Sequence, residues 1–576
     1  MSEARLLIYL LHDPEGYADL AVLHTLEAFR SVANHILVVS NGALLPQSEN
    51  ELGKVADEVL VRENTGYDVG AYRAGLKHVG RKHLNSFSEL VLANSTFFSV
   101  ETNFKPLFDR MASSDADFWG LTDHPKVTPN PFTGTGTLDA HLQTYWVVVR
   151  EKMLHDPHFF DYWQETQDPV TYAQAVSNFE SRFSRHFADL GFSWQAAFPA
   201  ADFGVENPTM EAPLALLGQG FPVVKKRLYF HGTEHLMNLG VSVARVTQAA
   251  VARGVSREMI MDAVARRTEA DQVSVALGAL YVVPTTDPDL EPSTLKWSVT
   301  NERPWRALAT GDTHPSVREL GDTEAQSSAN DISNVDILFV EPSPLLPPRA
   351  DGNLWRYENA LRATGNQRFL VSLMEEEARL GMIAPTLQFV GSAETDVEWL
   401  ANARRAWKIA EMMGLQERAS HHGPVAAYEG VAVYRTAALN GFGERIRKAG
   451  GWQQLVDVAG SEDALERILD QLAADHMLLG GFYAGRATTS EELTVEAPLW
   501  MVEAQAHFAR FKGYSEYMHN WKVLPSSPSR GQAFWVRSGG PNTYSALNEA
   551  YRRFPATYLV LNRLYNKARS WREERK

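Results

Sequence analysis

The first 150 residues alternate between apolar runs of strand length and apolar residues at helical spacing, which constrains the fold more than any other feature. Leu6–Leu11 is a continuous apolar run, as is typical of a strand buried on both faces of a sheet. Leucines and a phenylalanine then recur at helical spacing from Leu20 to Phe29. Strands that alternate with helices at this interval predict βαβ units and a mostly parallel sheet.

The same pattern continues along the chain. It predicts further strands at Ile36–Val39, Val59–Val61, Leu90–Ala93, Phe118–Leu121 and Val223–Phe230, and helices from about Val69, over Phe104–Met111 and over Tyr172–Leu190. Ligands of such sheets bind at the carboxyl ends of the strands. The polar residues that follow each strand are therefore the candidates for a site.

The length of 576 residues suits two or three domains of about 100–200 residues each. We predict a first domain over 1–245, a helical extension over 246–283, a Pro-, Thr- and Ser-rich linker over 284–333, a second, mainly helical α/β domain over 334–510 and a C-terminal segment over 511–576. The second domain is expected to begin with a strand at Val335–Val340. No internal repeat at a fixed short period is visible.

Composition excludes several classes of protein. The chain has no cysteine, which rules out disulfides, thiolate metal sites and cysteine nucleophiles. A net charge of −15 argues against nonspecific binding of nucleic acid. The apolar run near the N-terminus is too short for a signal peptide, and no run reaches the ~20 residues that cross a bilayer. We therefore expect a soluble, cytoplasmic protein.

The last segment departs from the acidic average. Residues 551–576 carry eight Arg or Lys against two Glu, interleaved with aromatic and aliphatic residues. A basic amphipathic tail of this kind can lie on an anionic membrane surface. The alternative is a C-terminal helix that packs on its own domain.

The strongest local signal is the segment Glu63–Gly75, which lies between a predicted strand and a predicted helix. Its first two glycines allow the backbone to turn tightly and to approach a ligand. Asn64 and Asp68 offer short polar side chains for a base or a ribose, and Arg73 can reach a phosphate. The alternative is an ordinary helix start with Asp68 as its N-cap.

This segment resembles the signature of the rhamnan synthesis protein F family, bacterial glycosyltransferases of cell-wall, capsule and O-antigen polysaccharides. Motifs that resemble the family follow in its order at Leu90–Thr96, Asp115–Thr122, His141–Tyr145 and Phe221–Arg227, and more weakly at Glu341–Pro344, Leu380–Pro385 and Asp463–Arg467. The resemblance implies a GT-A-like nucleotide-binding sandwich in the first domain. It also implies that a sugar is transferred from a nucleotide-sugar donor, expected to be dTDP-L-rhamnose, to a glycan or lipid-linked glycan acceptor. The anomeric centre of the sugar is inverted in this transfer. This sugar transfer is expected to take place at the inner face of the cell membrane.

The resemblance assigns donor binding to residues that match the family's motifs. These are Asn64, Gly66, Asp68, Arg73, Asn94, Thr96, Lys225 and Arg227. In GT-A enzymes an Asp-x-Asp motif usually follows the fourth strand and holds Mg²⁺ or Mn²⁺, which prefer oxygen ligands. Here Asn94-Ser95-Thr96 stands at that position without a carboxylate, so the metal is unknown. Asp115 and Asp117 precede their strand and are interpreted as surface or capping residues.

If no metal neutralises the departing diphosphate, cationic side chains must do so. Lys225, Lys226 and Arg227 are the candidates, and alternation along a strand would place the first and third on one face. The alternative is a solvated strand edge.

Inverting transfer also needs a base that takes the proton of the acceptor hydroxyl. Glu180, followed by Leu190-Gly191-Phe192, resembles the family's helix with that carboxylate, and His141 is the second candidate. Gln143 shares a strand face with His141 and could hold sugar hydroxyls. Asp123 and His124 follow a strand and are expected to contact donor or acceptor. The alternatives are a solvated helix face for the glutamate and a core position for the histidine.

Two other classes of function stay open. One is a noncatalytic glycan-binding or scaffold protein of a polysaccharide assembly complex that retains the fold. The other is a nucleotide-sugar epimerase or nucleotidyltransferase. Leu11-His12-Asp13-Pro14 follows the first strand where a dinucleotide-binding enzyme would have Gly-x-Gly-x-x-Gly, which argues against a dinucleotide site.

Overall fold

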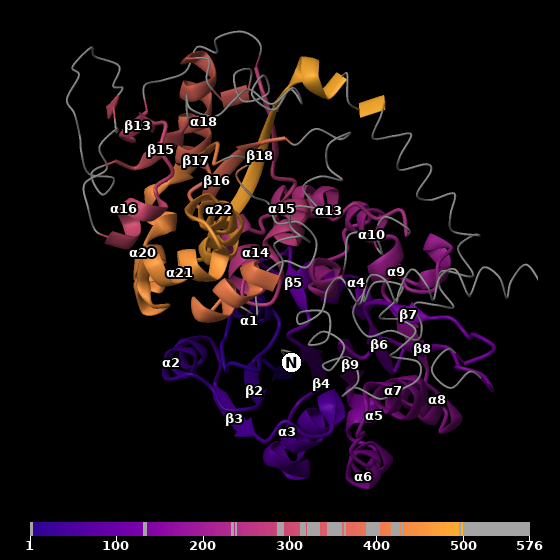
Figure 1. Cartoon of the computed structure of the whole chain (residues 1–576). Coiled ribbons are helices and arrows are strands. Elements are labelled where there is room, and N and C mark those ends of the chain that lie inside the picture. The colour runs from indigo at the N-terminus through magenta and orange to yellow at the C-terminus, as the bar shows by residue number, and fades with distance from the viewer. Residues whose placement is uncertain are drawn as a thin grey trace, which may run out of the picture. The chain divides into compact units, whose positions relative to one another are not determined.

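The computed structural model describes residues 4–130, 135–231, 236, 239–284, 293–310, 318–319, 335–341, 360–361, 364–386, 404–415, 427, 430–494 and 497–498. The chain divides into two compact units, Met1–Val264 and Ala265–Lys576 (Figure 1). This division differs from the boundaries at 245, 283 and 333 that the sequence predicts. The segment 511–576, with its basic tail, lies outside the described residues.

The first unit contains a seven-stranded sheet. Its strands lie in the order β10 (Trp194–Ala196), β6 (Phe118–Gly120), β9 (Trp146–Arg150), β4 (Glu89–Asn94), β1 (Arg5–Leu11), β2 (His35–Asn41) and β3 (Glu58–Arg62). Within this sheet only β9 runs antiparallel to its neighbours. The predicted α/β sandwich with a mostly parallel sheet is confirmed.

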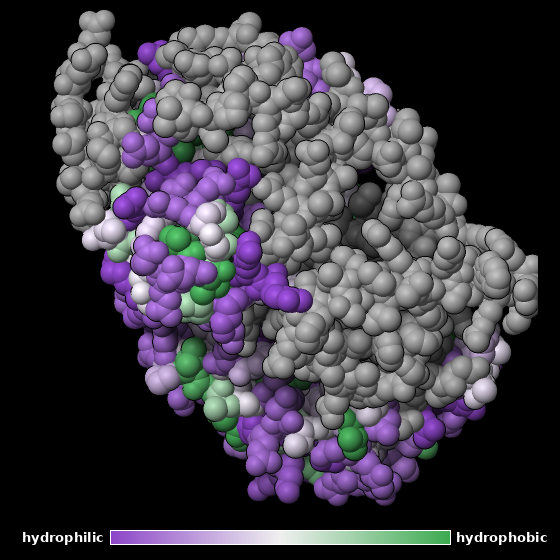
Figure 2. Space-filling model, viewed as in Figure 1, coloured by the Kyte–Doolittle hydropathy of each residue, from purple (hydrophilic) through white to green (hydrophobic). Residues whose placement is uncertain are grey.

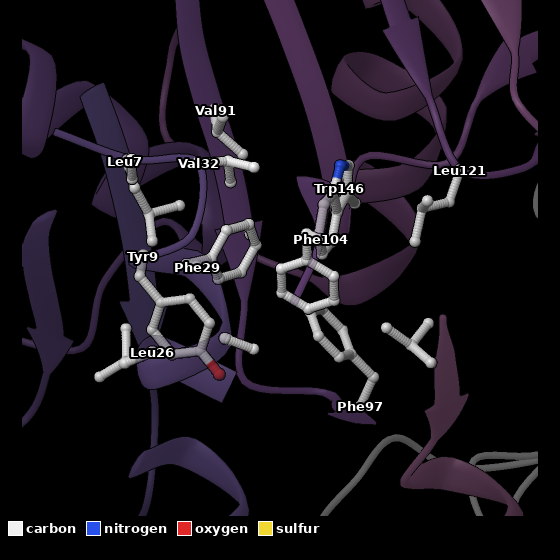
Figure 3. Close-up of a cluster of buried hydrophobic side chains, with 14 of the residues drawn as sticks. Leu7, Tyr9, Leu26, Phe29, Val32, Val91, Phe97, Phe104, Leu121 and Trp146 are labelled. Atoms are coloured by element: carbon white, nitrogen blue, oxygen red, sulfur yellow. The ribbon is translucent and has the colours of Figure 1, made fainter. Parts of the chain in front are cut away.

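Both faces of this sheet are covered, which explains the continuous apolar run of β1. Leu7, Tyr9 and Leu11 enter one buried cluster, whereas the side chains between them enter the other. Figure 3 shows the first cluster, where the Phe29 ring lies 4.5 Å from the Trp146 ring. Packed aromatic side chains therefore join the helix after β1 to strand β9.

The helices of the first unit connect and cover these strands (Figure 1). They are α1 (Leu20–Phe29), α2 (Pro46–Val55), α3 (Tyr67–Leu84), α4 (Lys105–Ala112), α5 (Glu151–Leu154), α6 (Pro157–Glu165), α7 (Tyr172–Ala175), a π-helical turn (Val176–Glu180), α8 (Ser181–Asp189), a 3-10 turn (Ala200–Phe203), α9 (Pro208–Glu211), α10 (Pro213–Gly218), α11 (Arg227–Phe230), α13 (Val243–Val251) and α14 (Arg257–Val264). Two small ladders lie outside the main sheet: β5 (Phe97–Ser99) with β11 (Val223–Lys225), and β7 (Asp123–His124) with β8 (His141–Leu142).

Helix α14 belongs to the first unit because it holds the start of α1. The Asp262 carboxylate accepts hydrogen bonds from the backbone N–H of Leu20 at 2.7 Å and from the Tyr17 hydroxyl at 3.1 Å. Asp19 caps the same helix by accepting from the N–H of Val22. Two carboxylates at a helix N-terminus also interact favourably with the helix dipole. The predicted helical extension is thus divided between the two units.

The second unit contains another seven-stranded sheet. Its order is β12 (Leu280–Val283), β18 (Tyr483–Thr489), β16 (Leu380–Pro385), β17 (Ala432–Arg435), β15 (Ile337–Val340), β13 (Trp297–Thr300) and β14 (Arg318–Glu319). Its helical segments include α15 (Ala270–Leu277), α16 (Trp305–Thr310), α18 (Thr364–Glu376), a 3-10 turn (Thr436–Leu439), α20 (Phe442–Lys448), α21 (Gly451–Ala459) and α22 (Glu462–Leu479).

The described part of the predicted linker is folded into this second sheet. Strand β13 pairs in parallel with β15, and α16 follows directly after it. Trp297–Thr300 is too short to stand out from the Pro- and Ser-rich sequence around it, which is why composition suggested a linker.

Figure 2 shows a described surface on which hydrophilic residues dominate and hydrophobic ones form small patches. Among the helices that the structure describes, none has the length and apolar character needed to cross a membrane.

Candidate functional site

Strand order places a topological switch point in the middle of the first sheet. From β1 the chain moves to β2 and β3 on one side, and then to β4 on the other side. Ligands of open α/β sheets bind beyond the carboxyl ends of the strands at such a point. His12 follows β1 there, and Asn94, Ser95 and Thr96 end or follow β4.

The two loops that carry most of the predicted donor-binding residues are joined at this point. The Asn94 side-chain amide donates a hydrogen bond of 2.7 Å to the Asp68 carboxylate. The carbonyl oxygen of the same amide accepts 2.6 Å from the Thr96 hydroxyl. Burial raises the pKa of Asp68, and the hydrogen bond from Asn94 opposes that rise. The segment 64–75 and the segment 94–96 therefore form one polar cluster.

Lys225 brings a cation to this cluster from the end of β11. Its ammonium nitrogen donates 2.8 Å to the Thr96 hydroxyl and lies 3.5 Å from the centre of the Tyr145 ring. Burial lowers the pKa of Lys225 to about 7, although the charges of Glu180 and Asp68 act in the opposite direction. An aromatic face attracts a cation and leaves its N–H donors available to a ligand.

Glu180 lies at the end of the π-helical turn that precedes α8. Its carboxylate accepts 2.8 Å from the backbone N–H of Thr144, which fixes it beside the start of β9. Burial raises the pKa of Glu180, and the Thr144 N–H, Lys225 and His124 oppose the rise. A carboxyl group whose pKa is raised toward neutrality is a better proton acceptor than an ordinary glutamate.

His124 and His141 stack face to face across the β7–β8 ladder. Their ring centres are 5.4 Å apart with 13° between the planes. Each Nδ1 donates to a backbone carbonyl, of Pro125 and Asp139 respectively, because a carbonyl can only accept. Burial lowers the pKa of both rings. Each neutral ring therefore keeps an unprotonated Nε2 that can accept a hydroxyl proton or hydrogen bond.

Arg73 does not join the cluster. Its guanidinium forms an ion pair of 2.7 Å with Asp168 and donates 2.6 Å to the Thr166 carbonyl. The same Asp168 lies against Gly66, where a Cβ would meet its Oδ1 at 2.3 Å. Gly66 has a φ of 71° and is the N-cap of α3, so Asp68 is not the cap. Gly66 therefore shapes the turn, and Arg73 holds the segment 166–168 over it.

The predicted strand over Val223–Phe230 is wrong beyond Lys225. Strand β11 pairs only with the three residues of β5, and α11 begins at Arg227. Lys226 is buried and forms an ion pair of 2.6 Å with Asp19. Arg227 is exposed and donates 2.9 Å to the His231 ring. Strand alternation therefore does not place Arg227 beside Lys225, although its charge is near enough to lower the pKa of Lys225.

The remaining predicted contacts have other partners. Asp123 accepts 2.6 Å from the N–H of Ala200, and Gln143 accepts 2.6 Å from the Thr122 hydroxyl. Asn64 is exposed in the loop between β3 and α3. Asp117 binds Lys152 and the N–H of Ser193, next to the start of β10.

Two residues of the cluster, His12 and Tyr145, were not singled out from the sequence. His12 is exposed directly after β1, donates through Nδ1 to the Asn41 carbonyl, and opposes the rise in the pKa of Asp68. The Tyr145 hydroxyl is bound at 2.7 Å by Thr122, which orients the ring under Lys225. The position of His12 directly after a buried strand was the signal that could have found it.

Within the described ranges, no group of three or more His, Asp or Glu side chains is arranged to hold a metal ion. At the cluster itself, the Asp68 carboxylate accepts from the Asn94 amide, and the Asn94 side-chain oxygen accepts from Thr96. Dependence on Mg²⁺ or Mn²⁺ therefore stays a prediction.

Fold and site together define the class of protein. It is an α/β protein that has buried acidic side chains and a lysine at the switch point of its sheet. Residues 36–293 match the sequence model of the family described as rhamnan synthesis protein F. The resemblance predicted from the ordered motifs is thus confirmed.

Individual relatives are distant. An uncharacterized protein of Sinorhizobium fredii is 26% identical over 201 residues, which covers 34% of this chain and 50% of the relative. The virulence protein VirA of Vibrio anguillarum is 23% identical over 225 residues, which covers 34% of this chain and 68% of that protein. The chain thus spans about half the length of the first of these relatives.

Among solved structures, 4-diphosphocytidyl-2C-methyl-D-erythritol synthase from Anaerococcus prevotii is 10% identical, with a TM-score of 0.23. The similarity covers 34% of this chain and 90% of that one. A TM-score this low adds no argument about fold or function.

Proposed function

We propose that the first unit is a glycosyltransferase that moves a sugar from a nucleoside-diphosphate donor to a glycan acceptor in the synthesis of a bacterial surface polysaccharide. The match of residues 36–293 to the rhamnan synthesis protein F family supports this reaction class. The cluster at the switch point supports its location. One observation carries the proposal: Lys225 lies on the Tyr145 ring, bound to Thr96, with Asp68 and Glu180 close enough to shift its pKa.

The chemistry follows from the charges. The acceptor hydroxyl oxygen attacks the anomeric carbon, the bond from that carbon to the diphosphate breaks, and the diphosphate leaves with the electron pair. Lys225 stabilises the negative charge that develops on the diphosphate. Glu180 takes the hydroxyl proton, and His141 is the second candidate for that role. Attack from the face opposite the leaving group inverts the anomeric centre.

The finer assignments are part of the same proposal. The donor is dTDP-L-rhamnose, and the acceptor is a glycan or lipid-linked glycan at the inner face of the cell membrane, with the tail 551–576 as a membrane contact. Asn64, Asp68 and Asn94 are proposed to contact the nucleotide, and His124 and Gln143 the sugar or acceptor.

The test measures binding and turnover of dTDP-rhamnose and other nucleotide sugars by the full chain. Replacing Lys225 by Met should weaken nucleoside-diphosphate binding by about 10- to 100-fold, as expected for loss of a charge-assisted contact. Lys77→Met, on the exposed face of α3, is the matched control and should bind as the unchanged protein does. Binding without turnover of any nucleotide sugar would favour the noncatalytic alternative, and neither binding nor turnover would remove the proposal.

A further inference from the structure

The second sheet repeats the strand arrangement of the first. Five strands of the first sheet lie in the order β1–β4–β9–β6–β10, and five of the second lie in the order β13–β15–β17–β16–β18. The order along the chain is the same in both sets, and so is the direction of every strand. In each set the fourth strand along the chain is the antiparallel one, inserted between the second and the third.

Strand order recurs in unrelated proteins, so it does not establish equivalence by itself. The hydrogen bonds at the amino ends of the strands are more specific. In the first unit the Ala4 carbonyl accepts from two consecutive N–H groups, of Ser88 and Glu89, at 2.8 and 3.3 Å. In the second unit the Lys296 carbonyl accepts from the N–H groups of Asp336 and Ile337, at 2.8 and 3.0 Å. The first two strands of each set therefore start in the same register.

An arginine ends the antiparallel strand in both units and makes the same contacts. Arg150 donates to the Ala116 carbonyl at 2.8 Å and to the Met111 carbonyl in the last turn of α4. Arg435 donates to the Leu380 carbonyl at 3.0 Å and to the Met374 carbonyl in the last turn of α18. Each guanidinium thus binds one carbonyl in the last turn of a helix and a second carbonyl at or just before the start of the strand that follows it.

The helix before the last strand ends in the same way in both units. Gly191 has a φ of 90°, and the N–H of Phe192 bonds to the Phe187 carbonyl at 3.0 Å. Gly481 has a φ of 75°, and the N–H of Phe482 bonds to the Met477 carbonyl at 2.9 Å. The glycine and the 6→1 hydrogen bond form a Schellman-type end.

This shared end fixes a residue-by-residue correspondence along the two helices. Glu180 lies twelve residues before Phe192, and Asp470 lies twelve residues before Phe482. The carboxylate that we propose as the base thus has a carboxylate at the same place in the second unit.

The surroundings of the two carboxylates differ. Asp470 is 2% exposed, and both of its oxygens are engaged, at 2.9 Å by the Arg303 guanidinium and at 2.7 Å by the Trp305 indole N–H. Glu466, one turn earlier on the same helix, also binds Arg303 at 3.3 Å. A carboxylate held in this way has no access to a substrate hydroxyl.

We propose that the second unit is a second copy of the fold of the first, in which the counterpart of Glu180 has become a structural partner of Arg303. The equivalence of the two copies is supported by their shared strand order, strand register and helix end. The consequence that transfer takes place in the first unit, and that Asp470 does not act as a base, rests on the proposed function.

The titration of Asp470 allows the inference to be tested through the stability of the protein, without measuring sugar transfer. Burial raises the pKa of Asp470 to about 6, while Arg303 and the Trp305 N–H oppose the rise and Glu466 adds to it. Tyr434, on β17, also faces this carboxylate, and its pKa is raised. Because the folded pKa lies above the ordinary value, ionisation of Asp470 costs stability as pH rises through about 6. Removing Arg303 should enlarge that loss.

The experiment compares thermal unfolding of the full chain at about pH 5 and about pH 8, on either side of the Asp470 titration. Arg303→Met should lower the unfolding midpoint, and the loss should be larger at the higher pH, where the unpaired carboxylate is ionised. Adding Asp470→Asn should restore much of the loss at the higher pH. If the single variant fails to fold, recovery in the double variant gives the same answer.

Transfer by Asp470→Asn, measured per folded protein, should stay within about twofold of the unchanged chain, a difference of about 0.4 kcal/mol. A pH-independent loss for Arg303→Met, or abolished transfer in Asp470→Asn with an unchanged unfolding midpoint, would overturn the inference. If the unchanged chain transfers no sugar, the proposed function fails, while the unfolding measurements still decide the role of Asp470.

Discussion

Glu180 and Asp470 occupy the same position in two copies of one fold, and they differ in the cation that faces them. Lys225 reaches Glu180 from β11, outside the main sheet, and is held by a hydroxyl and an aromatic ring. Arg303 follows β13 directly and binds Asp470 through a short ion pair in the interior. The fold therefore determines where the carboxylate lies, and the cation beside it determines whether the carboxylate can act as a base.

The largest effect expected from this comparison is on the rate of transfer. Glu180→Gln keeps the size and the hydrogen bond from Thr144 but removes the proton acceptor, so transfer should fall by about 100- to 10,000-fold. Nucleotide binding should be retained, because the donor is held by other residues. Initial rates with dTDP-rhamnose, together with titration calorimetry using the nucleoside diphosphate, measure both quantities.

The matched control for this change is Glu165→Gln, an exposed glutamate at the end of α6, which should leave the rate unchanged. Near-normal transfer by Glu180→Gln would mean that Glu180 is a structural anchor like Asp470, and His141→Gln would then be the variant to measure.

A smaller effect is expected from pH on nucleotide binding. Lys225 must be protonated to attract a diphosphate, and its pKa of about 7 means that the protonated fraction falls as pH rises through that value. Affinity should therefore drop by up to about tenfold for each pH unit above about 7. Lys225→Arg, whose guanidinium keeps its charge, should flatten this dependence.

Calorimetric titrations of the nucleoside diphosphate at several pH values would follow this effect. A steep pH dependence that survives in Lys225→Arg would assign it to another group, with the neighbouring histidines as the first candidates.

The smallest expected effect probes the duplicated helix ends. Gly191→Ala and Gly481→Ala each place a side chain at a positive φ, where an L-residue costs about 1–2 kcal/mol. Both changes should weaken hydrogen-exchange protection of the helix end by similar amounts, each in its own unit. A cost in one unit and none in the other would argue against equivalent helix ends.

The alternation of apolar runs predicted β1, β2, β3, β4 and β6 of the first sheet, because buried strands appear in a sequence as continuous apolar runs. It did not predict β9 or β10. It also predicted that segments 64–75 and 94–96 meet, and the bond between Asn94 and Asp68 joins them. The sequence could not show that Arg73 binds Asp168, since such a pair depends on how a distant loop returns to α3. Nor could it show that Lys226 turns inward to Asp19, because the length of β11 is set by its short partner β5.

The duplication was invisible to a search for repeats. The evidence for the duplication is a set of main-chain hydrogen bonds and one arginine in each unit. These features do not require the other side chains of the two units to be similar. Phe187 and Met477, or Glu180 and Asp470, fill the same places with different chemistry. Burial requires an apolar or paired side chain at such places but does not fix which one.

The position of Asp262 has a practical consequence for anyone who produces the first half of the protein alone. A fragment that stops at residue 245 would lose this carboxylate, leaving the Leu20 N–H and the Tyr17 hydroxyl without the acceptor that they share. It would also expose the buried side of α1 that α14 covers. Expression of the first unit alone should therefore extend at least through Val264.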